Sequence, residues 1–362
     1  MLSPLYNVLC RNRGDAETKK LVCTASEICG WLGNYQDANK DLILTTGGVR
    51  FLLRVLKELV QEFVTRCRRP SFHGASTDPE VDSNLLRHIA DALRRLSRSS
   101  EKVRSLVREE TAKVPERDFV TIDCNRDISY PAKIAVLVLL GAVKCGVPDQ
   151  PDDTSQNILP QNELIVSLTQ GLLDDLQSGQ ASPESQVLRR FDFVTTLMSA
   201  TSGQDAVSSL FIEAILWNAN VLRELVISIE PLFLKPGGDG TVIQEAPKRE
   251  LKNALFVIQN VSSREQQWLE SLHRTRELKS FIERLQGLLK SDGRHDDLHK
   301  QVALIVANSL NQVEDQQKVK VSHLVIDSLL ARAEQSVRGK HRTWSVDNTL
   351  KKVVMYNFCV LP

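Results

Sequence analysis

Apolar residues along this chain recur with the spacing of helices rather than that of strands. In several stretches they fall at positions i, i+3, i+4 and i+7, which places them on one face of an α-helix. Long runs of strict alternation are hard to find, and alternating segments are not joined by Asn-Gly or Asp-Gly hairpin signals. The pattern therefore predicts an all-α chain.

Two adjacent glycines interrupt the apolar run DLILTTGGVRFLLRVL at residues 41–56. A glycine inside a helix costs about 1 kcal/mol relative to alanine, so a pair of them indicates a boundary between two helices. We therefore expect the chain to turn at Gly47 and Gly48, with one helix before the turn and another after it.

A helical core motif recurs six times, each time as a small or apolar residue followed by an apolar helical face. The six segments are ASEICGWLGN from Ala25, ADALRRLSRS from Ala90, AVLVLLGAVK from Ala135, VTTLMSATSG from Val194, ALFVIQNVSS from Ala254 and ALIVANSLNQ from Ala303. Their successive starts are 65, 45, 59, 60 and 49 residues apart. The shortest intervals match repeats of about 40 to 47 residues that contain two or three helices. The sequence thus predicts an array of helical repeats.

The longer intervals require inserted loops between repeats. Four irregular stretches supply them, near residues 66–80, 111–131, 146–160 and 235–249. Three of the four are rich in Pro, Gly, Ser and charge, which is typical of loops. We expect the array to cover residues 1–338. The segment 339–362 ends in LKKVVMYNFCVLP, which is too apolar to stay solvated, so we expect it to cap the last repeat or to bind a partner.

The first two units resemble the armadillo repeat. The resemblance rests on TASEICGWLGNYQDANKDLILTTGGVRFLLRVLKEL at 24–59 and ADALRRLSRSSEKVRSLVREE at 90–110. In that family a helix with an A-x-x-x-L-x-N-L-like core leads through a polar link into a second helix, which ends in a small-residue turn before a third. NALFVIQNVSS and KQVALIVANSLNQ look similar. The resemblance implies a right-handed α-solenoid of about five to six armadillo-like repeats.

In armadillo proteins the third helices present polar stripes to a concave groove that binds extended protein segments. Arg50, Arg54 and Lys57 share one predicted helix face and would meet acidic partner groups. The full set of expected groove residues is Arg50, Arg54, Lys57, Glu163, Gln170, Asp174, Asn220, Arg223, Lys279 and Glu283. A groove whose charge changes along its length suits a peptide better than a nucleic-acid backbone. Taken singly, each stripe also fits an ordinary solvated face of an amphipathic helix.

The armadillo resemblance leaves a second function open, the regulation or chaperoning of small GTPases. The predicted acidic face of 163–174 is the part of the chain that would suit a polybasic tail. We keep this alternative beside the main expectation of a scaffold or adaptor.

Composition and charge narrow the functional classes. The 362 residues include 46 Lys and Arg against 45 Asp and Glu, so the net charge of +1 gives no overall attraction to nucleic acid or anionic membranes. The seven cysteines are odd in number and scattered, which suits a reducing compartment. The N-terminus lacks the pattern of a signal peptide, and no apolar run reaches about 18 residues. We expect a cytoplasmic or nuclear protein without membrane insertion.

Catalytic motifs are incomplete. His295 and His299 stand at i and i+4 as in zinc metallopeptidase helices, but Asp296 occupies the position of the catalytic glutamate and no third ligand follows at a defined distance. The glycine-rich KPGGDGT lacks the lysine of a phosphate-binding loop. We therefore expect a non-enzymatic protein with no metal and no cofactor. Little sequence precedes the first repeat to cap it, so we also expect the chain to form part of a larger array or assembly.

Overall fold

The structure of the chain is a computed structural model. It describes residues 15–35, 43–68, 78–98, 100–114, 122, 125–144, 162–178, 183–203, 205–229, 245–290 and 296–309. Within these ranges every long regular element is an α-helix and none is a strand, which confirms the predicted all-α class. Among the helices described, none is both long and apolar enough to cross a lipid bilayer.

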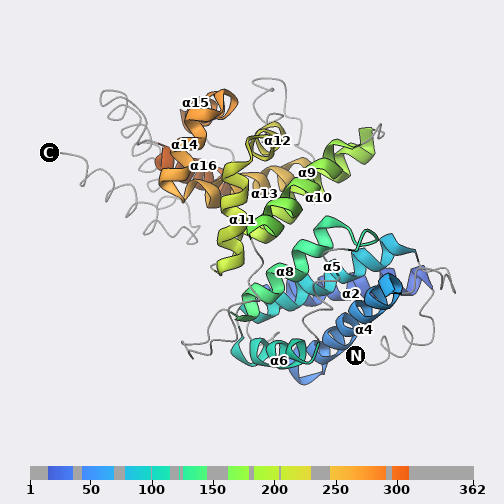
Figure 1. The fold of residues 1–362 in the computed structure, drawn as a ribbon. Coiled ribbons are helices and arrows are strands. Elements are labelled where there is room, and N and C mark those ends of the chain that lie inside the picture. Colours follow the sequence, from blue (N-terminus) through green and yellow to red (C-terminus); the bar gives the residue numbers. More distant parts are fainter. Residues whose placement is uncertain are drawn as a thin grey trace, which may run out of the picture. The chain divides into compact units, whose positions relative to one another are not determined.

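The helices keep the labels of Figure 1. They are α2 (Ala16–Tyr35), α4 (Gly48–Arg68), α5 (Pro79–Arg98), α6 (Glu101–Ala112), α8 (Tyr130–Lys144), α9 (Asn162–Gln177), α10 (Pro183–Thr201), α11 (Ala206–Trp217), α12 (Ala219–Ile229), α13 (Glu245–Ser262), α14 (Glu265–Arg274), α15 (Arg276–Lys290) and α16 (Asp296–Ser309).

The chain forms two compact units. Unit 1 consists of Met1–Gln180 together with Ser202–Phe211. Unit 2 consists of Ala181–Thr201 together with Ile212–Pro362.

In unit 1 the helices α2, α5 and α8 form a parallel row, with α5 in the middle (Figure 1). Near the start of α2, the ammonium group of Lys19 donates to the carboxylate of Asp82 near the start of α5, 63 positions later. Ser83 then contacts Ser129, just before α8, with 2.8 Å between the two hydroxyl oxygens and 46 positions between the residues. Because these contacts join the N-terminal ends of the three helices, the helices run in the same direction and lie level with one another.

A second layer of helices covers one side of this row. Helix α4 packs against α5 and α6, and α6 also packs against α5 and α8. The apolar core lies between the layers and includes Leu52, Leu86 and Leu93, none of which is exposed to solvent. Helix α9 packs against α8, where Gly171 leaves room for the ring of Tyr130.

The sequence around the start of α5 explains why the helix begins there. Pro79 occupies the first helical position, where its missing N–H costs nothing. The Asp78 carboxylate accepts a hydrogen bond of 3.0 Å from the backbone N–H of Glu80. Acidic residues in the first turn and basic residues in the last also complement the helix dipole.

Unit 2 contains a second parallel row, formed by α10, α13 and α16. The side-chain amide of Asn260 near the end of α13 donates to the Thr201 carbonyl at the end of α10, at 3.2 Å and a separation of 59 positions. In the same way, the amide of Asn308 in α16 donates to the Ser262 hydroxyl at 3.0 Å, across 46 positions. The helices α12, α14 and α15 pack around this row.

The six predicted core motifs lie in the six row helices. Each motif falls within one of α2, α5, α8, α10, α13 and α16 or begins there, and contacts between neighbouring row helices join residues 46 to 63 positions apart, close to the sequence intervals. Each unit thus contains a row of three helices that recur at similar intervals in the sequence. Of the predicted insertions, 146–160 lies outside the described residues, as does the segment 339–362. Near the predicted insertion at 66–80, α4 ends at Arg68 and α5 begins at Pro79, and residues 69–77 lie outside the described part of the chain.

Candidate functional site

Helix α4 follows directly from the glycine pair. Gly47 has a φ of 78°, in the left-handed region that favours glycine, and its N–H donates to the Leu44 carbonyl at 3.2 Å. Gly48 is the first residue of α4, and the Phe51 N–H donates to the Gly47 carbonyl at 2.9 Å. The predicted helix boundary is therefore confirmed.

The outward side of α4 is a narrow polar stripe on an otherwise buried helix. Arg50, Arg54 and Gln61 are exposed, as the spacing predicted, while Lys57 on the same face is only partly exposed. Most of the remaining positions are buried apolar residues, including Leu52. The stripe is therefore held rigidly in place by the core beneath it.

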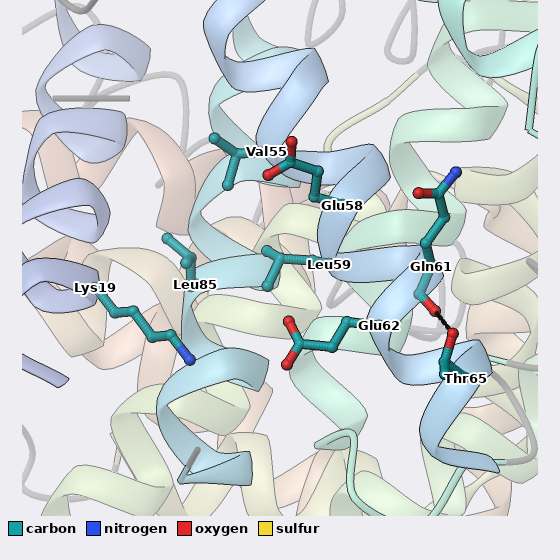
Figure 2. Close-up of a pocket in the computed structure, with 8 residues that line it drawn as sticks. All are labelled: Lys19, Val55, Glu58, Leu59, Gln61, Glu62, Thr65 and Leu85. Carbon is teal, nitrogen blue, oxygen red and sulfur yellow. Dashed lines mark hydrogen bonds between the residues drawn. The ribbon is translucent and has the colours of Figure 1, made fainter. Parts of the chain in front are cut away.

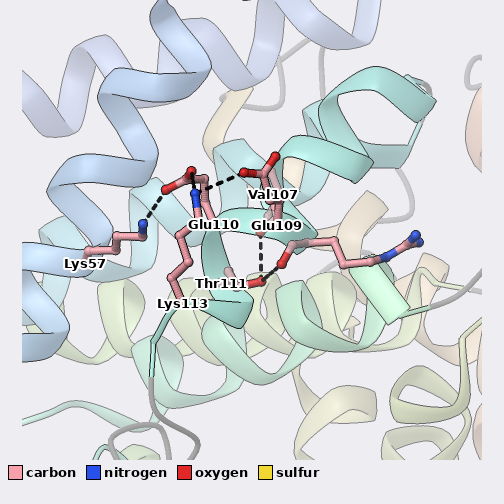
Figure 3. A network of polar contacts seen from close by, with 7 residues as sticks. Lys57, Val107, Glu109, Glu110, Thr111 and Lys113 are labelled. Carbon is pink, nitrogen blue, oxygen red and sulfur yellow. Dashed lines mark hydrogen bonds and ion pairs between the residues drawn. The ribbon is translucent and has the colours of Figure 1, made fainter. Parts of the chain in front are cut away.

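Lys57 is engaged by a neighbouring helix rather than fully open to solvent (Figure 3). Its ammonium group donates to the carboxylate of Glu110 in α6, and the same carboxylate also accepts from Lys113. These two lysines, Lys113 first and Lys57 second, lower the pKa of Glu110 to about 2. The network ties α4 to α6 and neutralises part of the predicted basic face.

A cavity of about 460 Å³ opens beside the stripe, where α4 faces α2 and α5 (Figure 2). Its lining consists of Lys19, Val55, Glu58, Leu59, Gln61, Glu62, Thr65 and Leu85. Glu58 and Glu62 stand one helical turn apart on α4, and both carboxylates point into the space between the helices. Val55, Leu59 and Leu85 supply an apolar wall. The volume falls in the range of about 300 to 1,000 Å³ that is usual for ligand pockets.

Four charged side chains, two of which line the cavity, form a continuous chain of ion pairs. The Asp82 carboxylate is only 1% exposed and accepts from both Lys19 and Arg66, the latter at 2.6 Å. Arg66 also pairs with Glu62 at 2.5 Å. Lys19 and Arg66 are thus balanced by Asp82 and Glu62 within this network, so Glu58 is the carboxylate of the cavity lining that adds negative charge beyond it.

The sequence-predicted site residues fall into separate groups. Arg50, Arg54 and Lys57 are together on α4. On α9, Glu163 and Asp174 are exposed, and the Gln170 amide donates to the Asp174 carboxylate at 2.7 Å. The remaining four predicted residues lie in unit 2, and all four are exposed: Asn220 and Arg223 on α12, and Lys279 and Glu283 on α15. Since α12 packs against α15, the unit 2 residues come from neighbouring helices.

Sequence reasoning missed the acidic half of the α4 site. Glu58 and Glu62 follow an i, i+4 spacing, but no local signal indicates that α2 and α5 leave a cavity beside them. His295 lies outside the described residues, and α16 begins at Asp296. In the part of the chain that the structure describes, no group of three or more His, Cys, Asp or Glu side chains is placed to hold a metal ion.

Comparisons with known proteins do not extend the description of this site. The sequence matches no protein-family model and no curated protein.

Proposed function

We propose that this protein is a non-enzymatic interaction scaffold that binds an extended segment of a partner protein. The observation that carries the proposal is the α4 site, where exposed arginines and a cavity lined by Glu58 and Glu62 lie side by side on one deeply packed helix. Such a site is rigid before binding, so most of the ordering cost falls on the partner alone.

The two parallel rows support an armadillo-like solenoid as the architecture of this scaffold. Within each row, neighbouring helices contact each other at level positions, as successive units do in repeat proteins. The proposal is a right-handed superhelix in which α4 and its counterparts α12 and α15 carry the polar faces. Solenoids of this kind bind elongated partners along extended surfaces.

The charges of the α4 site define the chemistry of the partner segment. An acidic group would pair with Arg50 or Arg54, and a lysine or arginine would enter the cavity between Glu58 and Glu62. The aliphatic part of that basic side chain would contact the apolar wall formed by Val55 and its neighbours.

Helix geometry sets the spacing of the two charges in the partner. Arg54 and Glu62 are eight residues apart, which corresponds to about 12 Å along an α-helix. An extended chain covers about 3.3 Å per residue, so the acidic and basic residues should be about three or four positions apart. The expected partner motif is an acidic residue followed or preceded at that interval by lysine or arginine.

A peptide-display selection on the intact chain tests this proposal. Enriched sequences are synthesised with a fluorophore, and their affinity is measured by anisotropy against the intact chain and against two variants, Arg54→Glu and Glu62→Lys. We expect each charge reversal to weaken binding by about fivefold or more. Peptides with the matching charge reversed should recover affinity for the corresponding variant.

Lys279→Glu on α15 is the matched control, because it is an exposed charge reversal on a helix of unit 2. It should leave the affinity of these peptides unchanged. The proposed binding role of the α4 site would be refuted if the selected peptides lacked the acidic and basic pair. It would also be refuted if they bound the intact chain and all variants with equal affinity. A loss only in the Lys279→Glu variant would move the binding surface to unit 2.

A further inference from the structure

The connection between α10 and α11 brings a serine hydroxyl against two arginines of α5. Ser202 accepts a hydrogen bond of 3.1 Å from Nη1 of Arg94 and one of 2.8 Å from Nη2 of Arg98. All three residues belong to unit 1. A serine oxygen has two lone pairs, so both guanidinium groups use the same acceptor and the hydroxyl hydrogen is directed away from them.

The cluster around this hydroxyl carries excess positive charge. The pKa of Arg94 is lowered to about 10, chiefly by burial and also by the charges of Arg98 and Arg95, against the opposing effect of Asp91 and Asp205. Three arginines thus stand near two aspartates, which leaves a local charge of +1. The Asp91 carboxylate is 3.7 Å from Nε of Arg94, which is too long for a strong hydrogen bond.

Ser202 is also the accessible hydroxyl of this connection. Its neighbour Thr201 is buried and donates to the Leu197 carbonyl at 2.9 Å. Ser208 is buried too, and its hydroxyl donates to Asp205. Ser202, by contrast, is partly exposed in an irregular segment just after the last residue of α10.

We propose that Ser202 is a phosphorylation site whose phosphate is held by Arg94 and Arg98. A serine kinase would transfer the γ-phosphoryl group of ATP: the bond from Ser202 Oγ to phosphorus forms, the bond to the β-phosphate oxygen breaks, ADP leaves, and the hydroxyl proton passes to the kinase. Asp205, three residues after the serine, stands in the sequence at the acidic position favoured by acidophilic kinases, and because it is buried in the fold, a kinase would read it as the connection opens.

The modification would strengthen the packing of the connection against α5. A phosphate adds about 1.5 to 2 negative charges and can accept one to three charge-assisted hydrogen bonds from an arginine cluster. It would bring the local charge of +1 to slightly below zero. Repulsion from Asp205 opposes this gain, but that carboxylate is turned toward α11, where it accepts from the Ser208 N–H at 2.9 Å.

Phosphoserine can be installed at position 202 of the full chain during translation, and hydrogen exchange of the amides of Ser208 and Ser209 then reports the strength of the contact. We expect exchange there to slow by about tenfold or more relative to the unmodified chain. Arg98→Gln, an exposed position, should abolish most of the slowing without unfolding the protein. The same exchange rates are measured for the unmodified chain in inorganic phosphate, which shows whether a phosphate ion that is not attached to Ser202 gives the same protection.

A second measurement asks whether a kinase reaches the site. The folded chain is incubated with an acidophilic serine kinase and ATP, and the sites are mapped by mass spectrometry beside the Ser202→Ala variant. Phosphate on Ser202 and its loss in the variant support the proposal. It is overturned if Ser202 stays unmodified while other serines react, if installed phosphoserine speeds exchange, or if inorganic phosphate alone gives the same protection.

Discussion

The buried ion pair between Lys19 and Asp82 makes an asymmetric prediction about stability. Their side chains are 6% and 1% exposed, and Asp82 has a second partner in Arg66. In Asp82→Asn the Lys19 ammonium stays buried without a carboxylate, and breaking such a pair from one side costs about 3 to 5 kcal/mol. We expect about 3 kcal/mol, because the asparagine oxygen still accepts one hydrogen bond.

Removing the lysine instead should cost much less. In Lys19→Met the methionine keeps the apolar stem, and the Asp82 carboxylate remains paired with Arg66 at 2.6 Å. We expect a loss of about 1 kcal/mol. The double variant should lose less than the sum of the two single variants, because the stranded ammonium is gone.

Hydrogen exchange is the suitable assay, because the chain has two compact units and global unfolding need not be two-state. Amides in the middle of α2 and α5 report the stability of unit 1, and those of α13 in unit 2 serve as an internal control that should not change. Equal losses in Lys19→Met and Asp82→Asn, or a loss below about 1 kcal/mol in Asp82→Asn, would refute the reasoning.

Three further predictions concern other contacts. Gly47→Ala should lower the stability of unit 1 by about 1 kcal/mol, measured by hydrogen exchange in the middle of α5, because of the positive φ of 78°, and Gly47→Asn should cost less, since asparagine tolerates that conformation. Gly171→Ala would place a Cβ inside the van der Waals radius of the Tyr130 ring and should cost about 1 to 3 kcal/mol, with Tyr130→Leu restoring part of the loss. The pKa of Glu110 is lowered from 4.5 to about 2, so its contribution, about 1 kcal/mol at most, is present above pH 4.5 and fades as the pH falls toward 2. The stability difference between the intact chain and Glu110→Gln should therefore shrink over that range in acid titrations followed by circular dichroism.

Local signals in the sequence were sufficient to predict the secondary structure and the repetition. Gly47 and Gly48 marked a helix boundary because few other residues adopt a positive φ, and the six core motifs marked the row helices because buried faces impose helical periodicity. The exposed stripe at Arg50 and Arg54 followed from the same periodicity. These features depend only on residues within a turn or two of one another.

Features that depend on distant parts of the chain could not be predicted. Lys57 pairs with Glu110, 53 positions later, and Lys19 pairs with Asp82 across 63 positions. No local pattern indicates either partner, because the sequence does not show which helices become neighbours. The cavity beside Glu62 has the same origin, since it is the space left between three helices that are separate in the sequence.

The level contacts within each row determine where additional residues can be inserted into this chain without disturbing its packing. The contact from α2 to α5 spans 63 positions and that from α5 to α8 spans 46, yet both join the starts of parallel helices. The connecting segments therefore differ in length without shifting the rows. Doubling the length of a flexible loop costs only about 0.6 kcal/mol. Evolution or an engineer can accordingly add sequence between row helices, such as an epitope or a reporter domain, while a single residue inserted inside α5 would rotate half of its buried face by about 100°.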